Sequence, residues 1–412
     1  MSLCPHAGLL HLDNFASGTP REEIARLRAA HRIVWQEDDH AAGGHWLVLQ
    51  AEDIDTVLKT PASFSNQFGP LLEDFPEEFL AEQRESMTFM DPPRHRLYRS
   101  LVDYAFRPKR IAARRPLTEA IAREIIDRVI DRGECEFIDE VALPLPVTVM
   151  FRLLGVPDSD FNRVVDLTNT LALANDPDYA ENRMQGFIAS MELLQYGEAL
   201  ADSHLADPRD SMTMEMLANE VEGHRLSSRE FGRFFVNLIV GGVETTRNTL
   251  GWLFYLLIKH PEQLALLQRE PDRVTAAVEE ALRHSNTVIY LRRTATRDMP
   301  FAGESIREGD KLVCILGSPN RDPALFDAPD AFDISRDPAK SRRHYRTFGA
   351  GPHFCVGVHQ ARQNLEVMTS EIITRMSDLR LLAEPTYSRS NFMDGFKRMP
   401  IAFEPADGAA AE

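Results

Sequence analysis

The chain is poor in cysteine: its 412 residues include only four, at Cys4, Cys135, Cys314 and Cys355. These cysteines are widely separated and form no Cys-x-x-Cys pair. Their spacing argues against a zinc knuckle and against a disulfide framework. At most one of the four is expected to carry chemistry.

Long hydrophobic runs are also missing. The longest apolar stretches, such as 251–258, fall far short of the roughly 18 to 20 residues that cross a bilayer. Residues 1–8 lack a basic region followed by an apolar core, which a secretory signal would need. We therefore expect no membrane anchor and a cytoplasmic protein.

Positive charge is scarce as well. The chain has 46 Lys and Arg against 63 Asp and Glu, which gives a formal net charge of -17. Such a surface repels phosphate backbones, so nucleic acid is not expected as a main partner. With 43% hydrophobic and 26% charged residues, the composition is that of an ordinary globular protein rather than a disordered or collagen-like one.

Helical periodicity dominates the chain. Sequence patterns typical of strands are limited to a hairpin between residues 32 and 50 and to residues 288–296 and 311–315. The pattern predicts a mainly α fold with a minor β region. Because no repeat, linker or composition break divides the chain, we expect one large domain over 21–403, an N-terminal extension over 1–20 and a disordered tail over 404–412.

A glycine-rich loop, Phe348-Gly-Ala-Gly-Pro-His-Phe-Cys-Val-Gly357, presents Cys355 at the start of a helix. The helix is indicated by apolar residues at a spacing of three and four after the loop. A thiolate there would be stabilised by the helix dipole and by backbone N–H groups. A lone cysteine is more often a small buried hydrophobe, but the flanking glycines favour a ligand role.

A second unusual segment lies in a long helix predicted over 228–259, which opens with a capping box at Ser227 and Glu230. Its apolar middle contains Gly241 and Gly242, followed at once by the polar residues Glu244 and Thr245. Helix interiors disfavour glycine, and buried helices disfavour unpaired polar groups. Taken alone, the segment could also be a helix crossing with Glu244 in a salt bridge.

The cysteine loop resembles the haem-binding loop of the cytochrome P450 superfamily, the haem-thiolate monooxygenases. The resemblance implies that Cys355 is the proximal thiolate ligand of the iron of haem b. Phe348, Gly349 and Gly357 would then border the haem, and His353 would contact one of its propionates.

The segment from Gly241 to Thr245 is similar to the oxygen-activation motif of this superfamily. By resemblance, Gly241 and Gly242 make room for dioxygen, Thr245 hydrogen-bonds the oxygen that is activated there, and Glu244 relays protons. Family members more often carry Ala and Asp where this chain has Gly241 and Glu244. The longer glutamate side chain changes the geometry of that relay.

Charged pairs match further family positions. Glu280 and Arg283 resemble the structural Glu-x-x-Arg pair, and Arg336 is a plausible third member, although an isolated pair of this kind is usually a solvated surface contact. His95 and Arg99 share a helical face and, by resemblance, bind haem propionate.

The strand after the Glu-x-x-Arg helix carries a further propionate ligand by the same resemblance, Arg293. Its neighbour Arg292 points to the opposite strand face, so only one of the two arginines should reach haem.

The resemblance places the roof and entrance of the substrate pocket in residues 64–87 and 167–191. Simple core packing is an equally good explanation for each apolar residue there. The possible substrate contacts are Phe68, Leu71, Leu72, Phe75, Val243, Val288, Ile289 and Leu291.

The implied activity is insertion of one oxygen atom from O2 into a C–H bond of an apolar small molecule: a lipid, terpenoid, steroid or aromatic compound. Electrons would come from NAD(P)H through a reductase and a ferredoxin, expected to be of the [2Fe-2S] type, or a flavodoxin. A peroxide-driven peroxygenase and a non-catalytic haem sensor remain as alternatives, but both leave Glu244 and Thr245 unexplained. A cysteine-nucleophile enzyme needs a general base in reach of Cys355, which sequence cannot supply.

Two basic segments stand out against the acidic background, and by resemblance both lie on the thiolate side of the haem. An acidic iron–sulfur protein could dock there, unless these residues are ordinary solvated surface. They are Arg107, Lys109, Arg110, Arg114 and Arg115 in the first segment, and Lys340, Arg342, Arg343 and Arg346 in the second.

Overall fold

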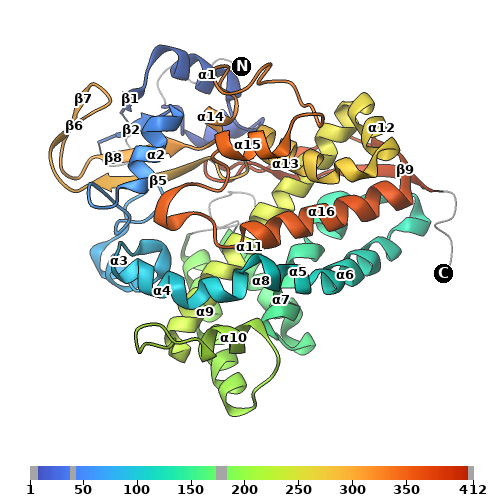
Figure 1. Cartoon of the computed structure of the whole chain (residues 1–412), viewed down its shortest axis with the longest axis horizontal. Coiled ribbons are helices and arrows are strands. Elements are labelled where there is room, and N and C mark those ends of the chain that lie inside the picture. The colour runs from blue at the N-terminus through green and yellow to red at the C-terminus, as the bar shows by residue number, and fades with distance from the viewer. Residues whose placement is uncertain (1–7, 38–42, 173–182, 407–412) are drawn as a thin grey trace.

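A computed structural model describes residues 8–37, 43–172 and 183–406. It confirms a single, mainly α domain with a minor β region (Figure 1). The α-helices are α1 (Arg21–Ala30), α2 (Ala51–Lys59), α3 (Glu77–Gln83), α4 (Arg94–Asp103), α5 (Pro108–Ala113), α6 (Arg115–Asp127), α7 (Pro144–Leu154), α8 (Phe161–Ala172), α9 (Arg183–Ala206), α10 (Met212–Ala218), α11 (Ser228–Lys259), α12 (Pro261–Arg269), α13 (Val274–Ser285), α14 (Gly317–Asn320), α15 (Pro338–His344) and α16 (Val358–Arg375).

The strands gather in small sheets. They are β1 (Ile33–Gln36), β2 (His45–Val48), β3 (Phe64–Ser65), β4 (Glu134–Glu136), β5 (Tyr290–Ala295), β6 (Met299–Phe301), β7 (Glu304–Ile306), β8 (Lys311–Ile315), β9 (Met376–Leu381), β10 (Thr386–Tyr387), β11 (Phe396–Arg398) and β12 (Pro400–Pro405). The largest sheet has the order β1-β2-β8-β5-β3, and its β2–β8 pair is parallel. Strand β8 is buried along its whole length, as the apolar sequence of a central strand requires.

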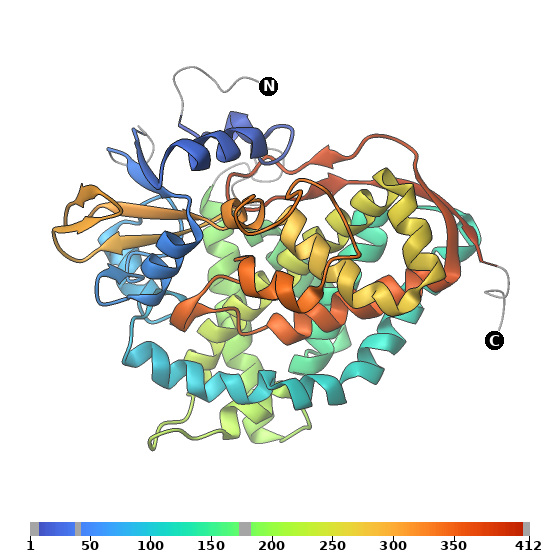
Figure 2. The same cartoon turned by 45° about the horizontal axis from the view of Figure 1, so that its top comes forward.

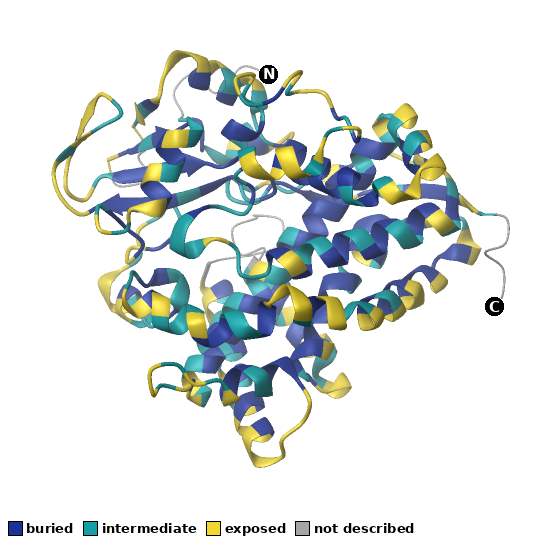
Figure 3. Ribbon diagram, in the orientation of Figure 1, coloured by how far each residue is buried: buried dark blue, intermediate teal, exposed yellow. Residues whose placement is uncertain are grey.

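Helix α11 forms the centre of the helical part. Its capping box forms as the sequence predicts, with Ser227 accepting from the Glu230 backbone and Glu230 accepting from the Ser227 backbone. Much of its length is buried, whereas the surrounding helices alternate between buried and exposed faces (Figure 3). The helix packs against α7, α9, α13 and α16. It therefore sets the position of any site built on its middle turns.

Residues near both chain ends pack against the rest of the described chain. Leu9, Leu10 and Phe15 are buried in one cluster with the large sheet, so the described part of the N-terminal extension belongs to the domain, beside α1 (Figure 2). Strand β12 pairs with both β4 and β9 and includes Glu404 and Pro405. The tail predicted over 404–412 thus includes Glu404 and Pro405, which sheet pairing holds in β12; residues 407–412 lie outside the described residues.

Within the described ranges, no helix combines the length and apolarity needed to cross a membrane.

Candidate active site

A cavity of about 360 Å³ lies between α11 and the loop that precedes α16. Its wall also includes residues at the start of β5 and residues Phe392 and Met393 near the C-terminus. Both sequence features singled out above open into it, since Cys355 and Thr245 each line the wall. This size is typical of a small-molecule site.

The cysteine loop owes its shape to two glycines in the left-handed region, Gly349 at φ +70° and Gly351 at φ +71°. A Cβ on Gly351 would lie 2.3 Å from the Leu58 carbonyl oxygen, so the loop presses directly on the end of α2. The loop closes with a hydrogen bond of 3.1 Å from the Cys355 backbone N–H to the Phe348 carbonyl. Only glycine allows this turn.

Gly357 and Gly241 both have open space where a Cβ would lie, with no atom within 4 Å. The two residues line the same cavity from different elements, Gly357 from the segment after the cysteine and Gly241 from α11. A flat ligand could approach the backbone closely at both places. Gly242 differs, because a Cβ there would lie 2.6 Å from Met150 Cε of α7.

Burial raises the pKa of the Cys355 thiol, while the Gly357 backbone, Arg99 and Arg362 act in the opposite direction. The protein thus supplies some, but not enough, stabilisation for a free thiolate. A coordinated metal deprotonates a thiol outright. The site suits a cysteine that carries its charge only when a metal ion is bound to it.

Thr245 faces the cavity, and its Oγ1 donates a hydrogen bond of 2.8 Å to the Gly241 carbonyl. Glu244 is placed differently. It is 4% exposed and accepts hydrogen bonds of 2.9 and 3.0 Å from Arg247, whose other nitrogen donates to the Phe396 carbonyl at 3.0 Å. Glu244 is therefore held in an ion pair away from the cavity lining, as the salt-bridge alternative anticipated.

Four basic side chains meet beside the cysteine loop, which we call the cation cluster: His95, Arg99, Arg293 and His353. The rings of His95 and His353 lie 4.0 Å apart. His353 Nε2 lies 3.0 Å from the Met90 carbonyl oxygen, whereas His95 Nε2 is buried and has no hydrogen-bond partner among the residues that the structure describes. Such an orphaned buried nitrogen points to a missing partner.

The pKa shifts in the cation cluster also indicate that a negatively charged partner is missing. Burial lowers the pKa of Arg293 to about 10. Burial, together with the charges of Arg99 and Arg293, lowers the pKa of His95 to about 4. The hydrogen bond of Arg293 goes to the Arg292 carbonyl at 2.7 Å, and Arg99 bonds to the Phe354 carbonyl and to Asp103. A ligand with carboxylates would offset this buried positive charge.

The residues present therefore fit haem: a thiol for the iron, open glycines for a flat ring, and the cation cluster for propionates.

Arg292 turns to the other strand face, as alternation predicts. It donates to the Asp74 carboxylate at 2.7 Å and to carbonyls of residues 71–73.

The Glu-x-x-Arg pair is fully buried. Arg283 donates to both Glu280 oxygens at 2.8 and 2.6 Å and also to three carbonyls from residues 320–331. Arg336 joins the pair, with its Nε 3.2 Å from Glu280 Oε1. We call these three residues the closed ion-pair cluster. It anchors the segment that leads to the cysteine loop.

Comparisons with known proteins agree with this geometry. The family model described as Cytochrome P450 matches residues 178–379. The chain is 32% identical to a steroid C26-monooxygenase of Rhodococcus jostii over 406 residues, which cover 96% of this chain and 84% of that protein. The chain belongs to the cytochrome P450 superfamily. This P450 is a monooxygenase in reaction class, and its family implies haem held by a cysteine thiolate.

Other relatives of this P450 include a methyl-branched lipid omega-hydroxylase of Mycobacterium bovis, 33% identical over 88% of this chain and 85% of that protein. Among solved structures, a Mycobacterium marinum cytochrome P450 in complex with pseudoionone matches with a TM-score of 0.86. It is 30% identical and covers 98% of this chain and all of that one (100%).

Only some of the residues expected to contact substrate line the cavity of this P450. Val288 and Leu291 line the cavity. The other six expected contacts do not line the cavity. Val243, Ile289 and Leu72 are buried in the hydrophobic core, and Leu71 is half-buried. The Phe75 ring packs against Phe79 and Phe89, and Phe68 is 40% exposed, with the Arg84 guanidinium over its ring. Of the predicted roof segment 167–191, residues 173–182 lie outside the described residues.

Sequence reasoning missed several cavity residues. Asn237 and Thr249 share the face of Gly241 and Thr245 at a spacing of four, a signal that could have found them. Thr88, Thr287, Phe392 and Met393 come from irregular segments whose sequence carries no comparable periodicity.

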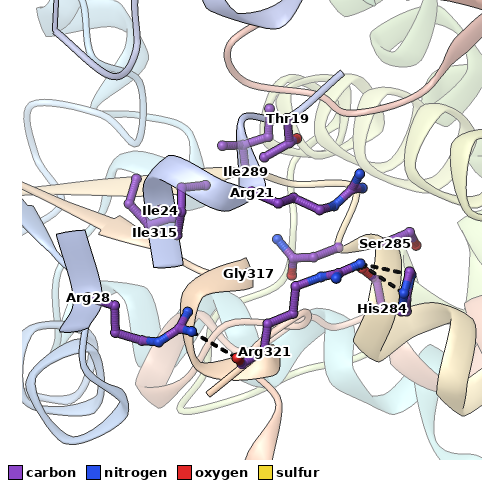
Figure 4. Close-up of a pocket in the computed structure, with 11 residues that line it drawn as sticks. Thr19, Arg21, Ile24, Arg28, His284, Ser285, Ile289, Ile315, Gly317 and Arg321 are labelled. Atoms are coloured by element: carbon purple, nitrogen blue, oxygen red, sulfur yellow. Dashed lines mark hydrogen bonds between the residues drawn. The ribbon is translucent and has the colours of Figure 1, made fainter. Parts of the chain in front are cut away.

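A second, smaller hollow lies where α1 meets α13 and α14 (Figure 4). Arg28 donates to the carbonyls of Ser318 and Arg321, and Arg321 contacts the ring of His284. Arg321 and Arg21 also form ion pairs with Asp330 and Asp394. Because the basic groups that line this hollow already have partners, we interpret them as contacts that hold α1 in place and not as a second reactive site.

Proposed function

We propose that this P450 inserts one oxygen atom from O2 into a C–H bond of an apolar small molecule such as a lipid, terpenoid or steroid. It would act in the cytoplasm, with electrons from NAD(P)H delivered by a ferredoxin. The observation that carries the proposal is the shared cavity: Cys355 and Thr245 line the same space, and Gly241, which has open space where a Cβ would lie, lines it too.

Haem bound to Cys355 would supply the one-electron and dioxygen chemistry. The protein's own residues hold and orient this group. Arg99 and Arg293 would offset the charge of its carboxylates, and His95 and His353 would donate hydrogen bonds to them, which lowers the cost of burying these charges. The apolar wall, which includes Val288 and Leu291, orients the substrate and excludes water.

Thr245 is the proposed hydrogen-bond donor at the oxygen site. Its hydroxyl can leave the Gly241 carbonyl, 2.8 Å away, and donate into the cavity instead. Glu244 takes part in this proposal only after its carboxylate breaks from Arg247 and turns toward Thr245, because in the present conformation Arg247 holds both of its oxygens.

The names of the relatives support the substrate class. A steroid C26-monooxygenase and a methyl-branched lipid omega-hydroxylase both act on large apolar molecules, and both are about one-third identical to this chain. The cavity wall is mainly apolar too. The identity of the substrate is open to a screen of lipids, terpenoids, steroids and aromatics.

The electron donor is proposed from charge. Arg107, Lys109, Lys340 and Arg343 are exposed and have no carboxylate partner among the described residues. The other basic residues of the two segments are held by acids: Arg110 and Arg114 by Glu215, Arg115 by Glu119, Arg342 by Glu279 and Arg346 by Asp55. The four exposed residues form what we call the basic rim, which suits an acidic [2Fe-2S] ferredoxin.

The proposed function is tested by turnover under ¹⁸O₂ with a ferredoxin and its reductase. We expect one labelled oxygen atom per product molecule. Thr245→Ala should still bind haem and substrate, but product per NAD(P)H should fall about tenfold as reduced oxygen is released as peroxide. Thr249→Ala, one turn further along the same cavity face, is the matched control. Product without label, or unchanged coupling in Thr245→Ala, would contradict the proposal.

A further inference from the structure

Asn237 is an amide in a mainly apolar cavity wall. It lies on α11 four residues before Gly241 and eight before Thr245, so all three share one face of the helix. The same cavity is lined by apolar residues such as Leu238, Val240 and Phe392. An amide in this position needs hydrogen-bond partners, because burying an unpaired polar group is costly.

Two hydroxyl groups meet this amide from the segment before α4. Asn237 Nδ2 donates to Ser86 Oγ at 2.8 Å, and Thr88 Oγ1 lies 3.4 Å from Asn237 Oδ1. Ser86 and Thr88 also hydrogen-bond each other at 3.2 Å. Asn237 and Thr88 both reach the cavity, whereas Ser86 is buried behind them. One N–H of the amide has no acceptor in the described part of the chain.

We propose that Asn237 and Thr88 form a polar subsite for a ketone or hydroxyl oxygen on an otherwise apolar substrate. The inference rests on the proposed function, since it concerns the same cavity. The free amide N–H donates to the substrate oxygen, and Thr88 Oγ1 is the second polar group in reach. A hydrocarbon would leave the second N–H of the Asn237 amide without an acceptor, so the subsite selects oxygen-bearing molecules over hydrocarbons of the same shape.

The helix geometry also fixes where oxidation falls. At 1.5 Å per residue, Asn237 lies about 6 Å along α11 from Gly241 and about 12 Å from Thr245. The oxidised carbon lies beside Gly241 and Thr245. The substrate oxygen and the oxidised carbon are therefore separated by about 6 to 12 Å, measured along the helix axis.

The test compares ketones with hydrocarbons of the same skeleton: androstan-3-one with androstane, and cyclododecanone with cyclododecane. Binding to the haem-loaded protein is measured by calorimetry and by the spin-state shift. We expect wild type to bind the ketone of at least one pair about tenfold more tightly, which is the size of one hydrogen bond. Asn237→Leu should abolish that ratio and keep hydrocarbon binding.

Val240→Ala, on the same wall, is the matched control and should weaken both members of a pair equally. Thr88→Val provides a second variant should Asn237→Leu not fold, and it should reduce the ratio. An unchanged ratio in a folded Asn237→Leu or Thr88→Val protein would overturn the subsite. So would a wild type that prefers no ketone, or that binds neither member of any pair. If the carbon monoxide band of a thiolate-ligated haem is missing as well, the proposed function fails, and not the subsite alone.

Discussion

The closed ion-pair cluster and the cation cluster both bury arginine, but they differ in the groups that pair with the arginine charge. In the closed cluster, the Glu280 carboxylate pairs with both Arg283 and Arg336, and carbonyls accept from the remaining Arg283 donors. In the cation cluster, Arg293 donates to a carbonyl, and His95 Nε2 has no hydrogen-bond partner in the described part of the chain. The difference teaches that a completed buried network serves the fold, whereas an incomplete one marks a place for a ligand.

Breaking the closed cluster should have the largest effect. Arg283→Met removes the arginine that donates to both oxygens of the buried Glu280 and leaves Arg336 as the remaining cation beside it, which costs about 3–5 kcal/mol of unfolding free energy. Urea unfolding of the haem-free protein measures this loss. The control is Arg26→Met, which removes the equally spaced but exposed pair with Glu23 and should change stability by less than about 1 kcal/mol. Equal effects of the two substitutions would contradict the comparison.

The same substitution in the cation cluster should act on the ligand instead. Arg293→Met removes a buried cation that lacks a carboxylate partner, so the haem-free protein should be as stable as wild type or more so. Haem, by contrast, should bind at least about tenfold more weakly, because one charge-assisted contact is lost. Haem transfer to apomyoglobin measures this affinity.

The adjacent Arg292→Met variant sharpens this result, because Arg292 holds residues 71–74 rather than facing the cation cluster. It should lower stability while haem affinity stays close to that of wild type. The reverse pattern in the two variants would show that Arg293 is structural.

A pH effect should follow from His95. Its pKa is lowered to about 4 in the folded protein, against about 6.5 in an unfolded chain. Between these values the unfolded state binds the extra proton, so the stability of the haem-free protein should fall as pH drops from 6.5 toward 4. His95→Gln should flatten that part of the stability profile.

Substitution of the exposed His31 serves as the control and should leave the profile unchanged. With haem bound, the propionates favour charged His95 and should reduce the slope in wild type. A profile that His95→Gln does not alter would refute this assignment of the pH effect.

The smallest effect is expected from exposed charges. Reduction by an acidic ferredoxin should slow as salt rises, because the Debye length falls from about 10 Å at 0.1 M to about 3 Å at 1 M. Lys109→Glu with Arg343→Glu should slow reduction further and leave substrate binding unchanged. Reversal of Arg209, which pairs with Asp207 outside the basic rim, is the control. Reduction that is independent of salt and of both rim charges would exclude the basic rim as the docking site.

The sequence predicted the fold class and the segments that meet in the cavity, because both depend on local patterns. Cys355 between glycines and Thr245 after Gly241 and Gly242 are such patterns. The orientation of Glu244 could not be predicted, since its ion pair with Arg247 competes with a cavity position and only packing decides between them. Arg110 shows the same limit, because its partner Glu215 lies 105 residues away.

The cavity residues near the C-terminus could not be predicted from the sequence for a related reason. Phe392 and Met393 reach the cavity from the segment between β10 and β11, which has no helical or strand periodicity, and backbone contacts with distant residues 287–289 hold this segment in place. Tertiary contacts place such residues, so a pattern along the chain carries no signal for them.

The central claim is that Cys355 alone holds the haem iron. The most direct measurement is the absorption spectrum of the reduced protein under carbon monoxide, for wild type, Cys355→Ala and the buried-thiol control Cys314→Ala. We predict the red-shifted band of a thiolate-ligated haem in wild type and in Cys314→Ala, and its complete loss in Cys355→Ala. A colourless wild-type protein, or loss of the band in Cys314→Ala with Cys355 intact, would contradict the account.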